Sequence, residues 1–190
     1  ETGRRFTLRD NNLRPTGKHQ LLFSGIVDGF TLDEETFNCK ILTRALPNGK
    51  YTWAIEAHSA TEQQELTGAF TVSSVDNTLP EIRGFSVSPP YFTPNRDGIS
   101  DRVWVNLFLT KEAHVSVYLI DDAGNHRPIA ERATNIAPNT PGLHTFEYEG
   151  GVDLGVTPPP DGIYKIIALA EDRLGQKTSA EGSLTIEHGG

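Results

Sequence analysis

Three oxygen-bearing side chains gathered around Gly98 are the residues of this sequence best suited to chemistry: Asn95, Asp97 and Asp101. A hard cation such as Ca²⁺ selects oxygen ligands at every second residue around a glycine turn, although the distal bidentate glutamate of such loops is missing here. The same side chains can instead form Asx turns that accept backbone N–H groups. We expect Asx turns, with a Ca²⁺ site at these three residues as the alternative and no other cofactor.

Two aromatic residues form the second candidate site. Trp104 and Phe108 lie on one face of an expected strand together with Asn106, and the opposite face carries valine and leucine. An apolar face that remains exposed marks an interaction surface. We expect this face to pack against another domain or a protein partner, with a glycan-binding platform as the alternative.

Patterns of catalytic and zinc-binding residues are missing from the sequence. The six histidines include no pair at the i, i+2 or i, i+4 spacing of a zinc site, and Cys39 is the single cysteine. There is no Gly-x-Ser-x-Gly nucleophile elbow and no phosphate-binding Walker loop. We therefore expect no catalytic residues and no enzymatic activity.

The charge balance narrows the class of partner. The sequence has seventeen basic and twenty-five acidic residues, which gives a formal net charge of −8. Nucleic acids and anionic membranes require clustered Lys and Arg, so neither is an expected partner. The sequence has no apolar run long enough for a membrane-spanning helix, and no membrane insertion is expected.

Period-two alternation dominates the segments that must position these residues. It is clearest over residues 51–57, 103–109, 115–119 and 164–170, and it recurs at Leu21 and Phe23. Strict alternation indicates strands with one face in a core and the other in solvent. Eighteen glycines and twelve prolines separate these short segments. The pattern predicts an all-β fold built from sandwiches.

An internal repeat predicts two domains of one kind. Residues 46–57 line up with residues 159–170, through Pro-Asn-Gly-Lys-Tyr in the first copy and Pro-Asp-Gly-Ile-Tyr in the second. Residues 17–25 line up with residues 142–150. We expect an Ig- or fibronectin-like domain over residues 1–76, a linker over 77–80 and a second domain over 81–190. The first half of the repeat has no counterpart before Gly17, so the first domain is either a smaller variant or incomplete.

The segment Pro89–Asp101 resembles the opening of bacterial Ig-like domains of the type named after the flagellar hook-capping protein. Leu46–Tyr51, followed by Val75–Pro80, is similar to the end of fibronectin-like stalk modules found in bacterial secreted and cell-envelope proteins, subtilisin-like proteases among them. Arg96 departs from the pattern, because the family usually has glycine there. Arg96 must therefore avoid a positive φ or carry strain.

The resemblance implies two tandem Ig-like or fibronectin III-like β-sandwiches. It also implies a non-catalytic extracellular module, a spacer or docking arm whose partners are the other domains of a larger bacterial surface or secreted protein. One alternative is an adhesion module for carbohydrate or a host protein. Another is a cap or filament subunit whose first domain is completed by a strand from another copy. Tyr51 and Tyr164 are expected to be core residues. A further idea is that Asp76 and Asn77 join Asp97 or Asp101 around an interdomain ion.

Overall fold

The computed structural model describes residues 3–189, and these residues form an all-β fold with almost entirely antiparallel pairing, which confirms the predicted class. The elements are β1 (Ile26–Asp28), β2 (Lys40–Ala45), β3 (Gly49–His58), β4 (Gln63–Val72), β5 (Ile82–Ser88), β6 (Tyr91–Phe92), β7 (Val103–Leu109), β8 (His114–Ile120), β9 (His126–Glu131), β10 (Gly142–Tyr148), the 3-10 turn η1 (Val152–Leu154), β11 (Gly162–Glu171) and β12 (Lys177–Ile186). Among the described residues, no helix is long and apolar enough to cross a membrane.

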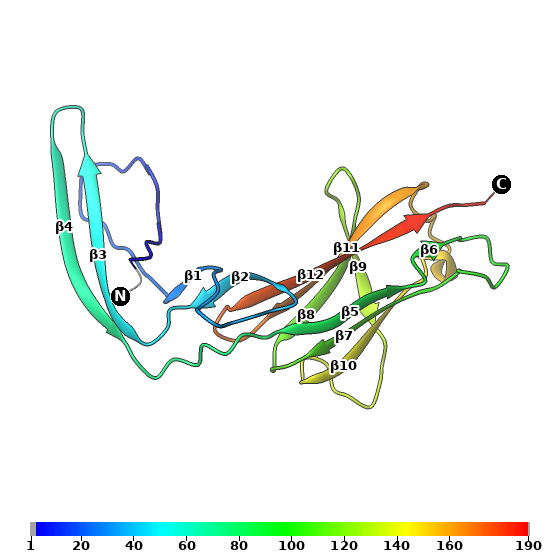
Figure 1. Cartoon of the computed structure of the whole chain (residues 1–190). Helices are drawn as coiled ribbons and strands as arrows, with labels where there is room; N and C mark the ends of the chain where they lie inside the picture. Colours follow the sequence, from blue (N-terminus) through cyan, green and yellow to red (C-terminus); the bar gives the residue numbers. More distant parts are fainter. Residues whose placement is uncertain (1–2, 190) are drawn as a thin grey trace.

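The second half of the chain folds into two facing layers (Figure 1). Strands β5, β7 and β10 pair in one layer, and β8, β11 and β12 pair in the other. Strand β9 belongs to both layers, because its first part pairs with β8 and its last residues pair with β10. The short strand β6 runs parallel to the end of β12.

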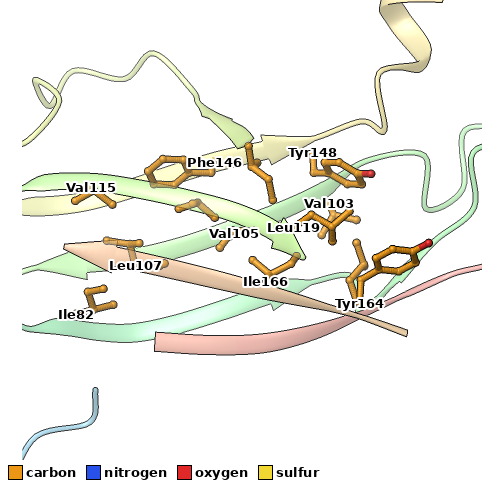
Figure 2. Packing of buried hydrophobic residues seen from close by; sticks show 14 of the residues in the cluster. Ile82, Val103, Val105, Leu107, Val115, Leu119, Phe146, Tyr148, Tyr164 and Ile166 are labelled. Atoms are coloured by element: carbon orange, nitrogen blue, oxygen red, sulfur yellow. The ribbon is translucent and has the colours of Figure 1, made fainter. Parts of the chain in front are cut away.

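The core of this sandwich lies between the two layers, as Figure 2 shows. The alternation of β7 places Val103, Val105 and Leu107 in full burial, while the intervening side chains face outward. Ile166 of β11 meets them from the opposite layer, also without exposure. Because apolar burial is the main favourable term in folding, the alternation of apolar residues fixes which face of each strand points inward.

Strands β1 and β2 extend the sheet of the sandwich. β2 pairs antiparallel with the beginning of β12, where Thr43 lies opposite Lys177 and Ile41 lies opposite Thr178. β1 adds to the outer edge of β2. Residues from the predicted first domain are thus hydrogen-bonded into the sheet of the second.

The hairpin β3–β4 stands apart from the sandwich at the other end of the molecule (Figure 1). Its ten residue pairs run from Gly49↔Val72 to His58↔Gln63. Tyr51 and Phe70 stack across the two strands with ring centroids 5.5 Å apart. This hairpin is the largest ordered element of the first repeat.

The expected arrangement of two tandem sandwiches, with a smaller or incomplete first one as the alternative, is not confirmed. Residues 3–76 contribute the β1–β2 pair and the β3–β4 hairpin, and no layer of strands faces the hairpin among the described residues. Residues 17–25, aligned in sequence with β10, form no strand. An extended segment needs a neighbour for its backbone groups, and in the described structure this segment makes a backbone bond only at its end, where the carbonyl oxygen of Gly25 accepts from the N–H of Leu46 at 2.8 Å. Residues 73–81, which include the predicted linker at 77–80, connect β4 to β5 without a strand.

Candidate functional site

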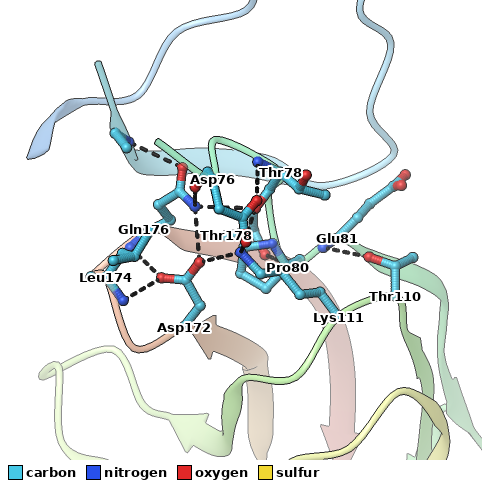
Figure 3. A network of polar contacts seen from close by, with 12 residues as sticks. Asp76, Thr78, Pro80, Glu81, Thr110, Lys111, Asp172, Leu174, Gln176 and Thr178 are labelled. Carbon is cyan, nitrogen blue, oxygen red and sulfur yellow. Dashed lines mark hydrogen bonds and ion pairs between the residues drawn. The ribbon is translucent and has the colours of Figure 1, made fainter. Parts of the chain in front are cut away.

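The junction between the linker and the sandwich is the most densely bonded polar site, and we call it the linker clamp: Asp76, Thr78, Lys111, Asp172 and Gln176 (Figure 3). The Lys111 ammonium, in the turn after β7, lies 2.8 Å from Oδ2 of Asp76 and 2.8 Å from Oδ2 of Asp172. It also donates to the carbonyl oxygen of Thr78 at 2.9 Å. One side chain of the sandwich thus holds both Asp76, the last residue of the predicted first domain, and Thr78 of the linker.

Gln176, just before β12, is fully buried and bonds to three other segments of the chain. Its Nε2 donates to the carbonyl oxygens of Asp76 and Thr78, at 3.1 Å each, and to Oδ2 of Asp172 at 2.8 Å. Its Oε1 accepts from the backbone N–H of Ala45 at the end of β2, at 3.1 Å. Gln176 therefore joins the first repeat, the linker and the sandwich.

Asp172 is positioned by the turn between β11 and β12. Its Oδ1 accepts from the backbone N–H groups of Leu174 and Gln176 at 2.9 and 3.0 Å. Gly175 has a φ of 89°, a left-handed conformation that suits glycine. These bonds close the hairpin turn between β11 and β12, and Oδ2 of the same carboxylate binds Lys111, which the sequence did not reveal.

The charges of the clamp stabilise one another. Hydrogen bonding to the Lys111 ammonium lowers the pKa of Asp76 to about 2. Burial acts to raise the pKa of Asp172, but hydrogen bonds from Lys111 and Gln176 outweigh it and lower that pKa. Burial likewise acts to lower the pKa of Lys111, and its bonds to both carboxylates raise it instead. All three groups are therefore charged over the whole neutral range of pH.

Further contacts continue the clamp along the linker into β5. The Thr178 hydroxyl donates to the carbonyl oxygen of Pro80. The Thr110 hydroxyl accepts from the backbone N–H of Glu81 at 3.0 Å. Leu79 is buried, as is Leu46 near the end of β2. A linker with so many bonded backbone groups is held in one conformation relative to the sandwich.

The predicted acidic loop uses its oxygens to bind its own backbone. Asp101 accepts from the N–H groups of Arg96 and Gly98 at 2.9 and 2.6 Å. Asp97 Oδ1 accepts from the N–H of Ile99 at 2.7 Å. Oδ1 of Asn95 accepts from the N–H of Asp97 at 3.1 Å. This bonding is that of Asx turns, and the alternative Ca²⁺ site at these residues remains a prediction.

Arg96 adopts a φ of 62°, so this non-glycine residue occupies the left-handed region. Its guanidinium donates to the carbonyl oxygen of Val152 in η1 at 2.7 Å, which holds the loop against the sandwich.

Asp76 pairs with Lys111 instead of reaching Asp97 or Asp101. The idea of an interdomain ion between these residues is therefore wrong: the acidic loop precedes β7 and Lys111 follows it, which places the loop and the clamp at opposite ends of that strand.

Trp104 and Phe108 lie on the outer face of β7, as predicted, with Asn106 between them. The guanidinium carbon of Arg132 lies 5.2 Å from the centroid of the Trp104 ring and covers part of it. Phe108 is 45% exposed and lies opposite Leu143 of β10, which is 54% exposed. The freely accessible apolar part of this face is therefore the Phe108–Leu143 pair.

Neither a protein-family model nor a curated protein matches the chain. Across residues 3–189, no three His, Cys, Asp or Glu side chains gather in a way that could hold a metal ion.

Proposed function

We propose that this chain is a non-catalytic Ig-like spacer or docking arm of a larger secreted or cell-surface bacterial protein, whose other domains are its partners. The linker clamp carries this proposal. A spacer must transmit position and force, and that requires a fixed linker more than a reactive site. Lys111 and Gln176 supply such a connection, because together they bind the linker, β2 and the turn at Asp172.

The strand order supports the Ig-like part of the proposal. The constant-type immunoglobulin sandwich has strands A, B, E and D in one sheet and C, F and G in the other. If β5 is taken as strand A and β6 is left out, strands B to G correspond in chain order to β7, β8, β9, β10, β11 and β12. The immunoglobulin order A-B-E-D then reads β5-β7-β10-β9, and C-F-G reads β8-β11-β12. All of these neighbours are observed here, and β9 pairs in addition with β8.

The tyrosine at the start of β11 also fits an Ig-like sandwich. In many Ig sandwiches a tyrosine near the start of strand F bonds back to the backbone a few residues upstream. The Tyr164 hydroxyl donates to the carbonyl oxygen of Pro160 at 2.7 Å. Tyr164 is buried, as expected from the sequence, whereas Tyr51 of the first repeat is only partly buried.

Spin-label distances between the two ends of the molecule test the spacer function. In a Cys39→Ser background, labels at Thr61 in the β3–β4 turn and at Ala123 in the β8–β9 turn span the arm. We expect a narrow distance distribution for the intact clamp and a broader one for Gln176→Ala. A broad distribution with the clamp intact would refute the rigid-arm proposal.

A binding role is the second candidate, and the exposed Phe108–Leu143 pair favours it. A carbohydrate or host-protein ligand on this face would lose affinity on Phe108→Ala. A glycan-array or protein-binding signal that Phe108→Ala leaves unchanged would exclude this face.

A further inference from the structure

His144 is a fully buried histidine whose ring connects the two ends of one loop. It lies on the inward face of β10, and the loop of residues 132–141 joins β9 to β10. Nδ1 of His144 lies 2.6 Å from Oε1 of Glu131, the last residue of β9. Nε2 lies 2.7 Å from the carbonyl oxygen of Thr140, near the end of the loop. One imidazole therefore holds the beginning of the loop and its end.

Both partners of this imidazole are hydrogen-bond acceptors. A carbonyl oxygen has no proton to donate, and neither has an ionised carboxylate. A histidine ring donates from both nitrogens only in its positively charged form, whereas the neutral ring donates from one nitrogen and accepts at the other. The two bonds of His144 can therefore exist together only while its ring carries both protons.

Glu131 is the charged group that faces His144. The inward-facing residues at this end of the core are apolar: Leu107 and Leu109 of β7, Ala113 and Val115 at the start of β8, and Ala170 of β11. The ionisable side chains adjacent to these strand ends are directed elsewhere: Arg83 toward Glu81, Lys111 and Asp172 into the linker clamp, Glu112 into solvent, His114 toward Ser116, Arg132 over the Trp104 ring, and Glu171 toward Lys177. The protonation of His144 is thus coupled first of all to the carboxylate of Glu131.

The end of the loop also holds the start of β8. The carbonyl oxygen of Asn139 accepts from the N–H of Ala113 at 3.0 Å, and Oδ1 of Asn139 accepts from the N–H of Val115 at 3.4 Å. Asn139 has a φ of 67°, a left-handed conformation that is less favourable than the ordinary one even for asparagine. Because Asn139 precedes Thr140, these two bonds depend on where the end of the loop is held.

We propose that His144 is a proton-controlled latch for the loop 132–141. While both ring nitrogens carry a proton, the loop is held at both ends. When the ring loses one proton to solvent, Nδ1 keeps its hydrogen, because its bond to the Glu131 carboxylate is the stronger, charge-assisted one. Nε2 then directs a lone pair at the carbonyl oxygen of Thr140, and this end of the loop is released. This inference does not depend on the spacer function.

Nitrogen-15 NMR of the full chain tests the latch in the wild type. The chemical shifts of Nδ1 and Nε2 report the protonation of the His144 ring as the pH is varied. We expect the backbone amide signals of Asn139, Thr140 and Ala113 to move with the same midpoint as this ring. A ring that keeps one protonation state over the whole pH range in which the fold is intact would overturn the proposal. A ring that titrates without moving these amide signals would overturn it as well.

Hydrogen exchange measures the release of the loop end. Once the His144 ring is neutral, the amides of Ala113 and Val115 should exchange about tenfold faster than before, after correction for the ordinary pH dependence of exchange. Val117 is the control, because it lies in the same strand but pairs with β9 instead of with the loop, and its protection should not change. Equal acceleration at Val117 would show a general loosening of β8 and contradict the latch.

Two variants assign the effect to one histidine. His144→Gln keeps a side chain that can hydrogen-bond but removes the titrating ring, so the loop amides should no longer respond to pH between about 5 and 8, where histidine titrates. His114→Gln is the matched control, since His114 is exposed on the neighbouring strand β8, and it should leave the response of the loop unchanged. A response that persists in His144→Gln would refute the assignment.

Discussion

Replacing Gln176 with alanine removes the side chain that joins the first repeat, the linker and the sandwich. The variant loses the bonds from Nε2 to Asp76, Thr78 and Asp172, and it leaves the backbone N–H of Ala45 without its acceptor. A typical hydrogen bond contributes about 0.5–1.5 kcal/mol, and a buried group left unpaired costs about 1–3 kcal/mol. Since two N–H groups serve three acceptors, we expect a total loss of about 3 kcal/mol.

For a chain of this length, that loss lowers the melting temperature by about 6–12 °C. Chemical denaturation, followed by tyrosine and tryptophan fluorescence, measures the free energy of unfolding directly. Gln63→Ala is the matched control, because Gln63 is exposed at the end of the β3–β4 hairpin, and we expect a change within about 0.5 kcal/mol there. Equal stability of the two variants would refute the function assigned to the clamp.

Four further outcomes follow from the contacts described above. Tyr164→Phe removes the bond to Pro160 and should cost about 1 kcal/mol in a denaturation experiment, whereas Tyr148→Phe removes a buried hydroxyl that has no partner and should be neutral or stabilising. Gly182→Ala should cost about 1–3 kcal/mol by crowding β5; an unchanged melting temperature would contradict that packing. In acid, the stability difference between the wild type and Lys111→Met should hold above the ordinary Asp pKa of 3.8 and shrink as the pH falls toward about 2, because a lowered pKa contributes stability that protonation removes. A difference that is as large at about pH 2 as at neutral pH would exclude the ion pairs as its source. Chelator should leave the melting temperature unchanged, because backbone N–H groups already bind the oxygens of the acidic loop. A rise in melting temperature of several degrees on adding Ca²⁺ would contradict this and support the alternative Ca²⁺ site.

The strands of the sandwich could be predicted because each buries one face. Val103 to Leu109 alternate in the sequence and in burial alike. The β8–β9 turn also depends on a local signal, because Gly124 follows Asp121 and Asp122 in the sequence and takes the left-handed conformation there, with a φ of 80°. These features depend on residues close together in the sequence.

The linker clamp could not be predicted, because Gln176 and Asp76 are a hundred residues apart. One signal was available: Thr178 shares the inward face of β12 with Leu184 and Ile186, and a polar side chain on that face requires a hydrogen-bond partner. The sequence pattern misled at Leu21 and Phe23, where alternation suggested a strand. A period-two pattern shows which face would be buried but does not supply the neighbouring strand.

Nuclear spin relaxation of backbone amides tests most directly whether the linker and the first repeat are rigidly joined to the sandwich. If the clamp and the β2–β12 pairing hold, amides of β1, β2 and residues 76–80 will report the same rotational correlation time as those of β7 and β11. A distinctly shorter time for the first set would show independent motion and contradict the account.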